Sequence, residues 1–257
     1  DNEQIILRNG FVVLETDQTA TNTENFGNVN VNLGTNYLHL DTRAGGRFDG
    51  SFASLALENG GVLKITNMNG AHTWGTGAGD DRLLVQDASG LTLVGDAAPG
   101  TASQQVIPGL FGGSLPESFM PTTGSASNRT AYTVQNAYAY LGSGMGLMTL
   151  ENGYLRPLTA SEYHIGGSPV AGTNWMIDRY IEPGNAVNLD NYASRNVTQD
   201  ITVNSLTVSL NPGATGQSVP TSGPDYLIIE PGRTLTVSSG ILNFANFLES
   251  ASSSTEV

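Results

Sequence analysis

Short runs of alternating apolar and polar residues recur along the chain, and Val, Ile, Leu and Thr fill most of them. No long window places apolar residues at the i, i+3, i+4 and i+7 spacing of an amphipathic helix. Gly, Asn, Pro, Asp and Ser separate the runs and favour turns. The pattern predicts an all-β protein. The strands are expected at 11–14, 29–33, 37–40, 55–57, 62–65, 83–85, 91–94, 201–210, 227–229 and 235–237.

A short phrase marks several turns: an aliphatic residue, a Glu, an Asn or Pro, and then a Gly. Glycine adopts the positive φ that a tight corner requires, and a preceding Pro presets the turn. The same order of residues is typical of β-hairpins, which remain an alternative to corners between stacked coils. The four glycines of this phrase are Gly60, Gly153, Gly184 and Gly232.

Stacked coils account for more of the pattern than hairpins do. In a β-solenoid each coil lies about 4.8 Å above the last, and backbone hydrogen bonds join the coils. The stretch 201–210 has this character, because Leu206 and Val208 face one way and Thr207 faces the other. The step at Asn204 and Ser205 shifts the alternation, as a corner or bulge does. We therefore expect one β-helix domain over residues 1–257.

The alternation breaks between residues 97 and 131, where four prolines and several glycines occur together with Ile107, Leu110 and Phe111. A long Pro- and Gly-rich segment inside a domain is typically a functional loop or a linker, and the apolar residues argue against a free linker. We expect an irregular lobe packed on the side of the β body. The Ser-rich residues 249–257 are expected to fray or to connect to further chain.

The order of strands and turns in the second half resembles a known family. Residues 146–158 contain a strand, the Leu-Glu-Asn-Gly turn and a second strand, and the phrase Thr-Val-Asn-Ser-Leu at 202–206 precedes a Ser-Gly-Ile-Leu phrase at 239–242. This order resembles the repeat of bacterial autotransporter-associated β-strand repeat proteins, best over 139–244 and more weakly over 25–66. The resemblance implies a right-handed parallel β-helix exposed outside a bacterial cell, commonly as the passenger of a type V secretion system. It implies neither a cofactor nor a common active site.

The charge excludes several classes of partner. The net charge is −13, and the basic residues are nine arginines and the single lysine Lys64. Nucleic-acid backbones and anionic membranes require clustered cations, so neither is expected as a partner. No apolar run is long enough for a membrane helix, and no cysteine is present to form a disulfide or a thiolate site.

Residues for catalysis or tight metal binding do not form a recognisable motif. His39, His72 and His164 lack the spacing of metal ligands on a helix, and neither a Gly-x-Ser-x-Gly nor a phosphate-binding loop is present. The Gly-rich stretch 75–83, with Asp80 and Asp81, resembles one unit of the calcium-binding repeats of secreted proteins. Such sites need stacked copies, so a solvated turn is the alternative interpretation.

Four tyrosines form a possible contact surface, since Tyr rings can stack on sugars or meet a partner, although half-buried packing is the commoner role. They are Tyr132, Tyr138, Tyr140 and Tyr154.

The sequence thus predicts a non-catalytic structural or adhesive protein, outside the cell or on a bacterial surface. Its expected partners are further copies of itself, stacked end to end in a fibre or surface layer, or glycans on host or neighbouring cells. The alternative is a carbohydrate-active β-helix enzyme, either a polysaccharide lyase or a glycoside hydrolase, which would need a pair of carboxylates on exposed strands.

Overall fold

The structure is a computed structural model that describes residues 4–15, 20–41, 46–68, 74–96, 99–115, 146–165, 168–178, 196–209 and 227–245. Strands dominate these residues, which confirms the prediction of an all-β protein. The chain divides into two compact units: residues 1–93 with 106–158, and residues 94–105 with 159–257. The single domain expected over 1–257 stays a prediction.

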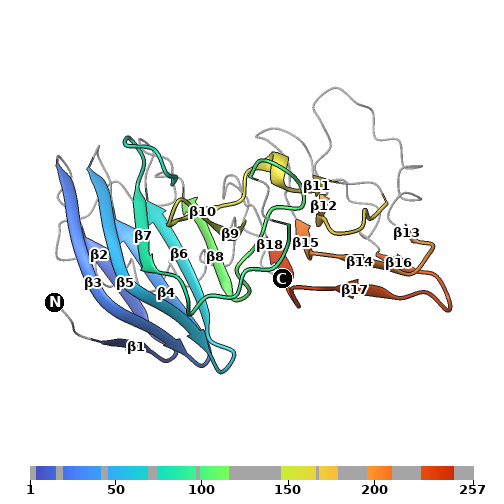
Figure 1. Cartoon of the computed structure of the whole chain (residues 1–257), viewed down its shortest axis with the longest axis horizontal. Coiled ribbons are helices and arrows are strands. Elements are labelled where there is room, and N and C mark those ends of the chain that lie inside the picture. Colours follow the sequence, from blue (N-terminus) through green and yellow to red (C-terminus); the bar gives the residue numbers. More distant parts are fainter. Residues whose placement is uncertain are drawn as a thin grey trace, which may run out of the picture. The chain divides into compact units, whose positions relative to one another are not determined.

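The first unit is built on one curled sheet of ten strands (Figure 1). The strand order is β1-β3-β5-β7-β10-β9-β8-β6-β4-β2, so odd and even strands from the first part of the chain form two separate arms. Pairing is parallel within each arm. The strands are β1 (Ile5–Leu7), β2 (Phe11–Glu15), β3 (Thr21–Asn32), β4 (Thr35–Asp41), β5 (Arg47–Glu58), β6 (Val62–Met68), β7 (Arg82–Asp87), β8 (Leu110–Leu115), β9 (Gly146–Glu151) and β10 (Tyr154–Pro157).

Each coil of this unit contributes one strand to each arm. Thr21 of β3 pairs with Arg47 of β5, and Thr35 of β4 pairs with Val62 of β6. Register partners are 26 residues apart between β3 and β5 and 27 residues apart between β4 and β6, as for Asn25 with Ser51 and His39 with Thr66. The chain therefore returns to the same lateral position once per coil, as the stacked interpretation requires.

An antiparallel hairpin joins the two arms. β9 pairs with β8, and β10 pairs with β7. The loop between β9 and β10 has two residues, Asn152 and Gly153, both with positive φ (52° and 84°). This copy of the turn phrase thus closes a hairpin, whereas Asn59 and Gly60, with φ of 50° and 74°, turn the chain from one arm to the other.

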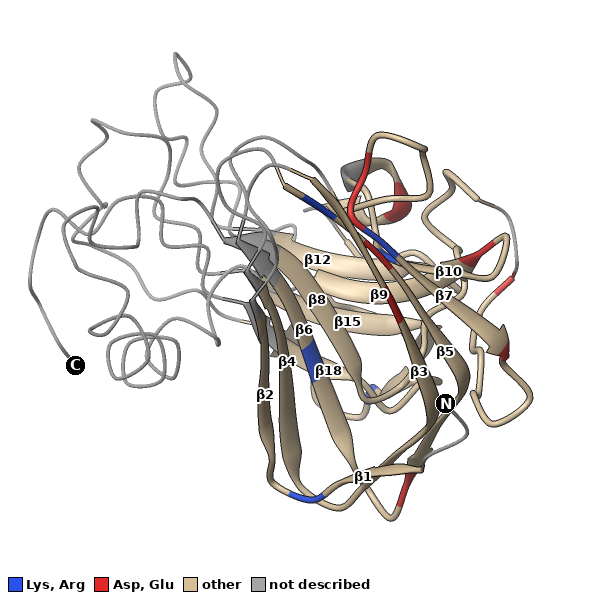
Figure 2. Ribbon diagram, turned by 90° about the vertical axis from the view of Figure 1, so that its left-hand side faces the viewer, with Lys and Arg blue, Asp and Glu red and all other residues tan. Residues whose placement is uncertain are grey.

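The core of the first unit lies between the arms. Figure 2 shows the sheet curling so that β2, β4 and β6 lie opposite β3, β5 and β7. Val31 and Leu55 from one arm and Leu40 and Ile65 from the other are fully buried in one cluster. Their burial favours alternation over most of these strands, because a shift by one residue would turn the apolar set outward. The alternation is interrupted in β5, where the buried Phe52 and Leu55 are three residues apart.

The second unit is wholly parallel in its described residues. It contains three small sheets, ordered β11-β12-β15-β18, β13-β16 and β14-β17, and one 3-10 helix, η3 (Ala160–Glu162). Two successive coils run β13-β14-β15 and β16-β17-β18, and strand pairs with strand across the coils. The strands are β11 (His164–Ile165), β12 (Asn174–Asp178), β13 (Asn196–Val197), β14 (Ile201–Val203), β15 (Ser205–Ser209), β16 (Ile228–Ile229), β17 (Leu235–Val237) and β18 (Leu242–Ala245).

The corner expected at residues 204 and 205 is present, because β14 ends at Val203 and β15 begins at Ser205. Residues 91–94 are not a strand, so that prediction is wrong. Part of the segment expected to be an irregular lobe, 110–115, is strand β8, and Ile107 and Leu110 belong to the core. The rest of 116–131, and the tail 249–257, lie outside the described residues.

Candidate functional site

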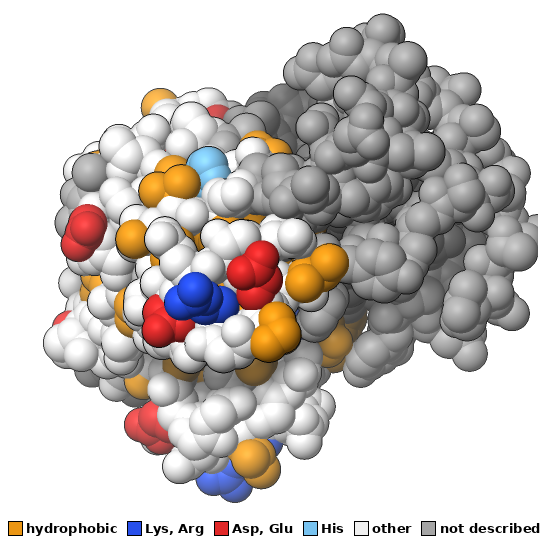
Figure 3. Space-filling view, turned by 90° about the vertical axis from the view of Figure 1, so that its right-hand side faces the viewer, with side chains coloured by type: hydrophobic (Ala, Val, Ile, Leu, Met, Phe, Trp, Pro, Cys, Tyr) orange, Lys and Arg blue, Asp and Glu red, His pale blue; other side chains and the backbone are white. Residues whose placement is uncertain are grey.

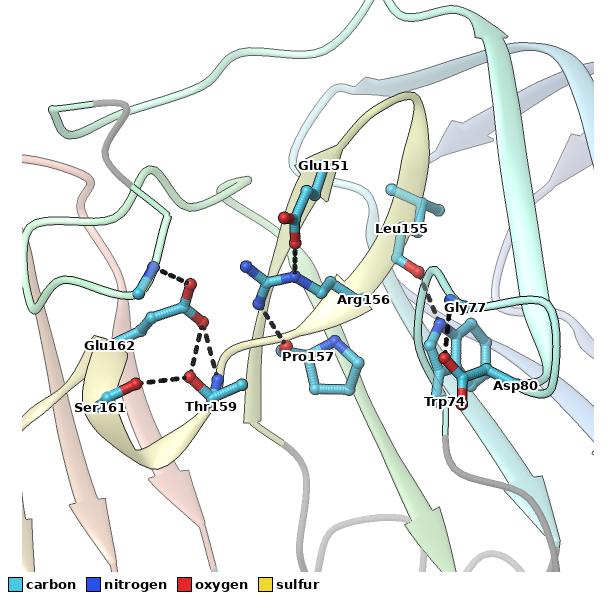
Figure 4. A network of polar contacts seen from close by, with 11 residues as sticks. Trp74, Gly77, Asp80, Glu151, Leu155, Arg156, Pro157, Thr159, Ser161 and Glu162 are labelled. Atoms are coloured by element: carbon cyan, nitrogen blue, oxygen red, sulfur yellow. Dashed lines mark hydrogen bonds and ion pairs between the residues drawn. The ribbon is translucent and has the colours of Figure 1, made fainter.

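The Gly-rich turn of the first unit uses Asp80 to fix its own backbone. The Oδ2 atom of Asp80 accepts a 2.7 Å hydrogen bond from the Gly77 amide, and its own amide donates to the Gly77 carbonyl over 3.1 Å (Figure 4). Just before the turn, the indole of Trp74 donates to the Leu155 carbonyl over 2.6 Å. The bonds between Asp80 and Gly77 close the turn on itself, and the Trp74 bond joins it to β10.

Asp81 has a different partner. Its side chain is fully buried, and Oδ1 accepts a 2.8 Å hydrogen bond from the Phe48 amide at the start of β5. The two carboxylates proposed for calcium therefore bond to separate backbone amides. Among the described residues, no group of three His, Asp or Glu side chains is placed to hold a metal ion. The hydrogen bonds of Asp80 and Asp81 to backbone amides are those of a structural turn that leads into β7.

The predicted turn glycines have the expected backbone. Gly60, Gly153 and Gly232 have φ of 74°, 84° and 78°, in the left-handed region that glycine favours. Gly184 lies outside the described residues. These glycines shape the chain and do not form a site.

Tyr154 is the one described member of the predicted tyrosine surface, since Tyr132, Tyr138 and Tyr140 lie outside the described residues. Its ring is half-buried, and the Arg82 guanidinium lies 5.3 Å from the ring centroid. Arg82 also forms an ion pair with Asp49, and Arg47 lies 3.5 Å from the same carboxylate. The hydrogen bond to Asp49 raises the pKa of Arg82. Tyr154 is thus one end of a small charged cluster on β5, β7 and β10.

Hydrogen-bonded rows of polar side chains cover the outer face of β3, β5 and β7. The Ser51 hydroxyl donates to Asn25 Oδ1 over 2.8 Å and accepts from Gln86 Nε2 over 3.4 Å. Three residues further along each strand, Ser54 donates to Asn28 Oδ1 over 2.9 Å. Asn25 with Ser51 and Asn28 with Ser54 are register pairs of the parallel sheet. Gln86 reaches Ser51 diagonally, because the register partner of Ser51 on β7 is Leu84.

An aromatic row crosses the other arm of the first unit. Phe11, Tyr37, Lys64 and Phe111 are successive register partners on β2, β4, β6 and β8. The rings of Phe11 and Tyr37 lie 5.9 Å apart, and Lys64 Nζ lies 5.6 Å from the Tyr37 centroid. All four are half-buried, and burial lowers the pKa of Lys64. The row thus places the Lys64 ammonium group over an aromatic ring, in a cation–π contact.

A ladder of buried amides runs through the second unit. Asn204 Nδ2 donates to Asn174 Oδ1, and the Ser205 hydroxyl donates to the same oxygen over 2.9 Å. Asn174 Nδ2 in turn donates to the carbonyls of Gln104 and Glu162. The ladder is a scaffold feature, because both amides are almost wholly buried and their bonds join one coil to the next.

A buried carboxylate completes the scaffold of the second unit. Glu162 at the end of η3 accepts a 2.8 Å hydrogen bond from the Thr159 amide (Figure 4) and a 2.9 Å hydrogen bond from the Gly100 amide. The Thr159 hydroxyl lies 3.2 Å from the same carboxylate and 3.0 Å from the Ser161 hydroxyl. Glu162 is therefore satisfied by the backbone of its own unit, in the manner of a helix cap.

Alternation predicts which side chains face outward, but it does not pair strands across a coil. For that reason the sequence did not reveal the Arg82–Asp49 cluster, whose members are 33 residues apart, or the aromatic row. The one available signal was that Asp49, Ser51, Arg82 and Gln86 occupy alternate positions in their strands.

The face seen from the right-hand side of Figure 1 bears few charged side chains among the described residues. In the space-filling view of Figure 3, these lie among uncharged polar and hydrophobic ones. Within the described residues, no helix has the length and apolar character needed to cross a membrane. No protein-family model, curated protein or solved structure matches this chain.

Proposed function

We propose that this chain is a non-catalytic extracellular structural or adhesive protein, built as a right-handed β-helix and presented on a bacterial surface. The observation that carries the proposal is the parallel pairing of successive coils, with Thr21–Asn32 on Arg47–Glu58 in the first unit and Ser205–Ser209 on Asn174–Asp178 in the second. Connections between parallel strands of one sheet are right-handed in about 98% of cases, which supports that hand.

The proposed contact surface is the outer face of β3, β5 and β7. Sugar hydroxyls both donate and accept hydrogen bonds, as side-chain amides do, and the exposed amides of Asn25 and Gln86, linked through the buried Ser51, supply such groups on neighbouring strands. The aromatic row on β2, β4, β6 and β8 adds ring faces for stacking. Both surfaces favour glycans of host or neighbouring cells as the partner.

Retention on insoluble polysaccharides tests this function. The chain is expected to sediment with at least one insoluble glycan among cellulose, chitin and acidic bacterial polysaccharide. The double variant Asn25→Ala with Asn28→Ala removes two row acceptors and is expected to weaken retention about five-fold, the effect of losing roughly 1 kcal/mol of contact. The control Thr198→Ala with Gln199→Ala changes exposed polar residues outside the rows.

Two results would contradict the proposal. One is the absence of retention on every glycan, or equal retention of the row variant and the control. The other is the appearance of new reducing or unsaturated ends when the chain is incubated with soluble polysaccharide, which would identify it as the carbohydrate-active enzyme of the alternative hypothesis.

A further inference from the structure

The core of the second unit is open at its last described coil. Trp175, Leu206 and Leu242 are register partners on β12, β15 and β18, and they are 0%, 3% and 55% exposed. A second column behaves alike, because Val197 is fully buried while its partner Ile229 is 44% exposed. Two apolar positions that a neighbouring coil covers in the preceding coil are thus uncovered at this end, whereas Val237, the register partner of Val203, stays half-buried against the core.

The backbone of this coil is also open. Within the described residues, β16, β17 and β18 each pair on one side only, with β13, β14 and β15. Such an edge is a template for further strands, and an uncovered apolar edge favours association. A further coil would therefore gain both hydrogen bonds and burial of Ile229 and Leu242.

The distribution of charge allows two copies to meet at this coil. The whole chain carries a net charge of −13, which opposes association of like molecules. The coil 227–245 contains only Glu230 and Arg233 as charged residues, so this end is neutral. Two copies can approach through it without adding like charges at the contact.

We propose that two copies of this chain dock end to end through the coil 227–245. The occupant is a second copy of the same coil, because strands of equal length and equally uncovered apolar columns then meet in a self-complementary, two-fold contact. The edge strands of the first unit, β1 and β2, would make a smaller contact with a second copy. A coil there offers one strand in each of two arms, whereas the coil 227–245 offers three strands. This inference rests on the stacked coils of the proposed function and replaces an open fibre by a closed pair.

Sedimentation equilibrium of the whole chain over a range of concentrations tests the pair. The wild type is expected to shift from monomer to dimer with no larger species. Leu242→Lys places a charge in the contact and is expected to raise the dimer dissociation constant about 30-fold or more. Leu33→Lys is the matched control, because Leu33 is also 55% exposed but lies in the first unit, and its dimer should be unchanged.

Circular dichroism and the melting temperature of each variant establish that it is folded. Ile229→Lys supplies a second variant at the same end if Leu242→Lys fails to fold. A wild type that stays monomeric at every concentration, or lysine variants that dimerise as tightly as the wild type, would overturn the inference. Glycan retention by the folded Leu242→Lys variant is expected to be unchanged, so failure of the dimer and failure of the proposed function are separable.

Discussion

Asn204 and Asn174 occupy consecutive coils of the second unit, and their side-chain amides are joined by a hydrogen bond of 2.8 Å between Asn204 Nδ2 and Asn174 Oδ1. Both amides are shielded from water, and each has several partners. A buried amide that is fully paired costs little, whereas its loss removes a hydrogen bond from each of its buried partners. The ladder therefore fixes the alignment of one coil on the next.

Asn174→Leu is expected to lower the free energy of unfolding of the second unit by about 3 kcal/mol or more, because each buried partner left unpaired costs roughly 1–3 kcal/mol. The partners are the carbonyls of Gln104 and Glu162, the amide of Asn204 and the hydroxyl of Ser205. Urea unfolding measures the change. Asn28→Ala, at an exposed amide, is the control and should cost about 0.5 kcal/mol or less.

Asp81 is expected to act as a backbone acceptor. Asp81→Ala leaves the buried Phe48 amide without its 2.8 Å partner and should cost about 1–3 kcal/mol. Asp81→Asn retains an oxygen at Oδ1 and should cost less. Chemical unfolding distinguishes the two, with calcium and with chelator. A larger loss for Asn than for Ala, or a calcium-dependent stability that either variant removes, would contradict this role.

Stability should rise with pH through the titration of Lys64. Burial beside Tyr37 lowers the pKa of Lys64 in the folded chain below the usual 10.5, so the unfolded chain binds the proton more tightly. The cost of burying the ammonium is fully present at neutral pH and is relieved as pH rises from the folded pKa towards 10.5. Lys64→Met should therefore be at least as stable as the wild type at pH 7, with a difference that shrinks as pH rises towards 10.5 in urea unfolding. A difference that grows with pH would refute the sign.

Alanine at the left-handed glycines is expected to cost about 1–2 kcal/mol in unfolding free energy, since a Cβ at positive φ clashes with its own backbone. Gly60→Ala isolates this term, because no atom lies within 4 Å of the added Cβ. Gly153→Ala should cost somewhat more, because its Cβ would lie 3.0 Å from Leu84 Cδ1. Equal stability of both variants and the wild type would show that these turns do not need glycine.

Alternation in the sequence was sufficient to locate most strands, because the buried faces require it. It located the strand at 62–65 and the corner at Asn204, but it placed the starts of β3 and β5 too late. Residues from Thr21 and Arg47 onward are polar on the outer face, and they are strands because each pairs with the other one coil away. Such long-range pairing overrides local propensity.

Strand β8 was not predicted from the sequence because it contains two glycines. β8 contains Gly112 and Gly113, which local rules assign to a turn, yet Gly112 has room for no Cβ beside Met148. Residues 91–94 were expected as a strand because they are mostly apolar, but in the structure only Val94 forms a β-bridge. The polar and aromatic rows could not be predicted. They combine residues from different coils, and the sequence does not show which residues of one coil pair with which residues of the next.

Cysteine cross-linking measures the stacked register most directly, because the chain has no cysteine of its own. In Asn28→Cys with Ser54→Cys the thiols replace side chains that already touch across β3 and β5, and neighbouring strands are about 4.8 Å apart, within disulfide range. In Asn28→Cys with Glu58→Cys the second site is displaced by roughly 13 Å along β5. Mild oxidation should cross-link the first pair rapidly and leave the second reduced. Equal cross-linking of the two pairs, or preference for the second, would contradict the parallel stacking of coils.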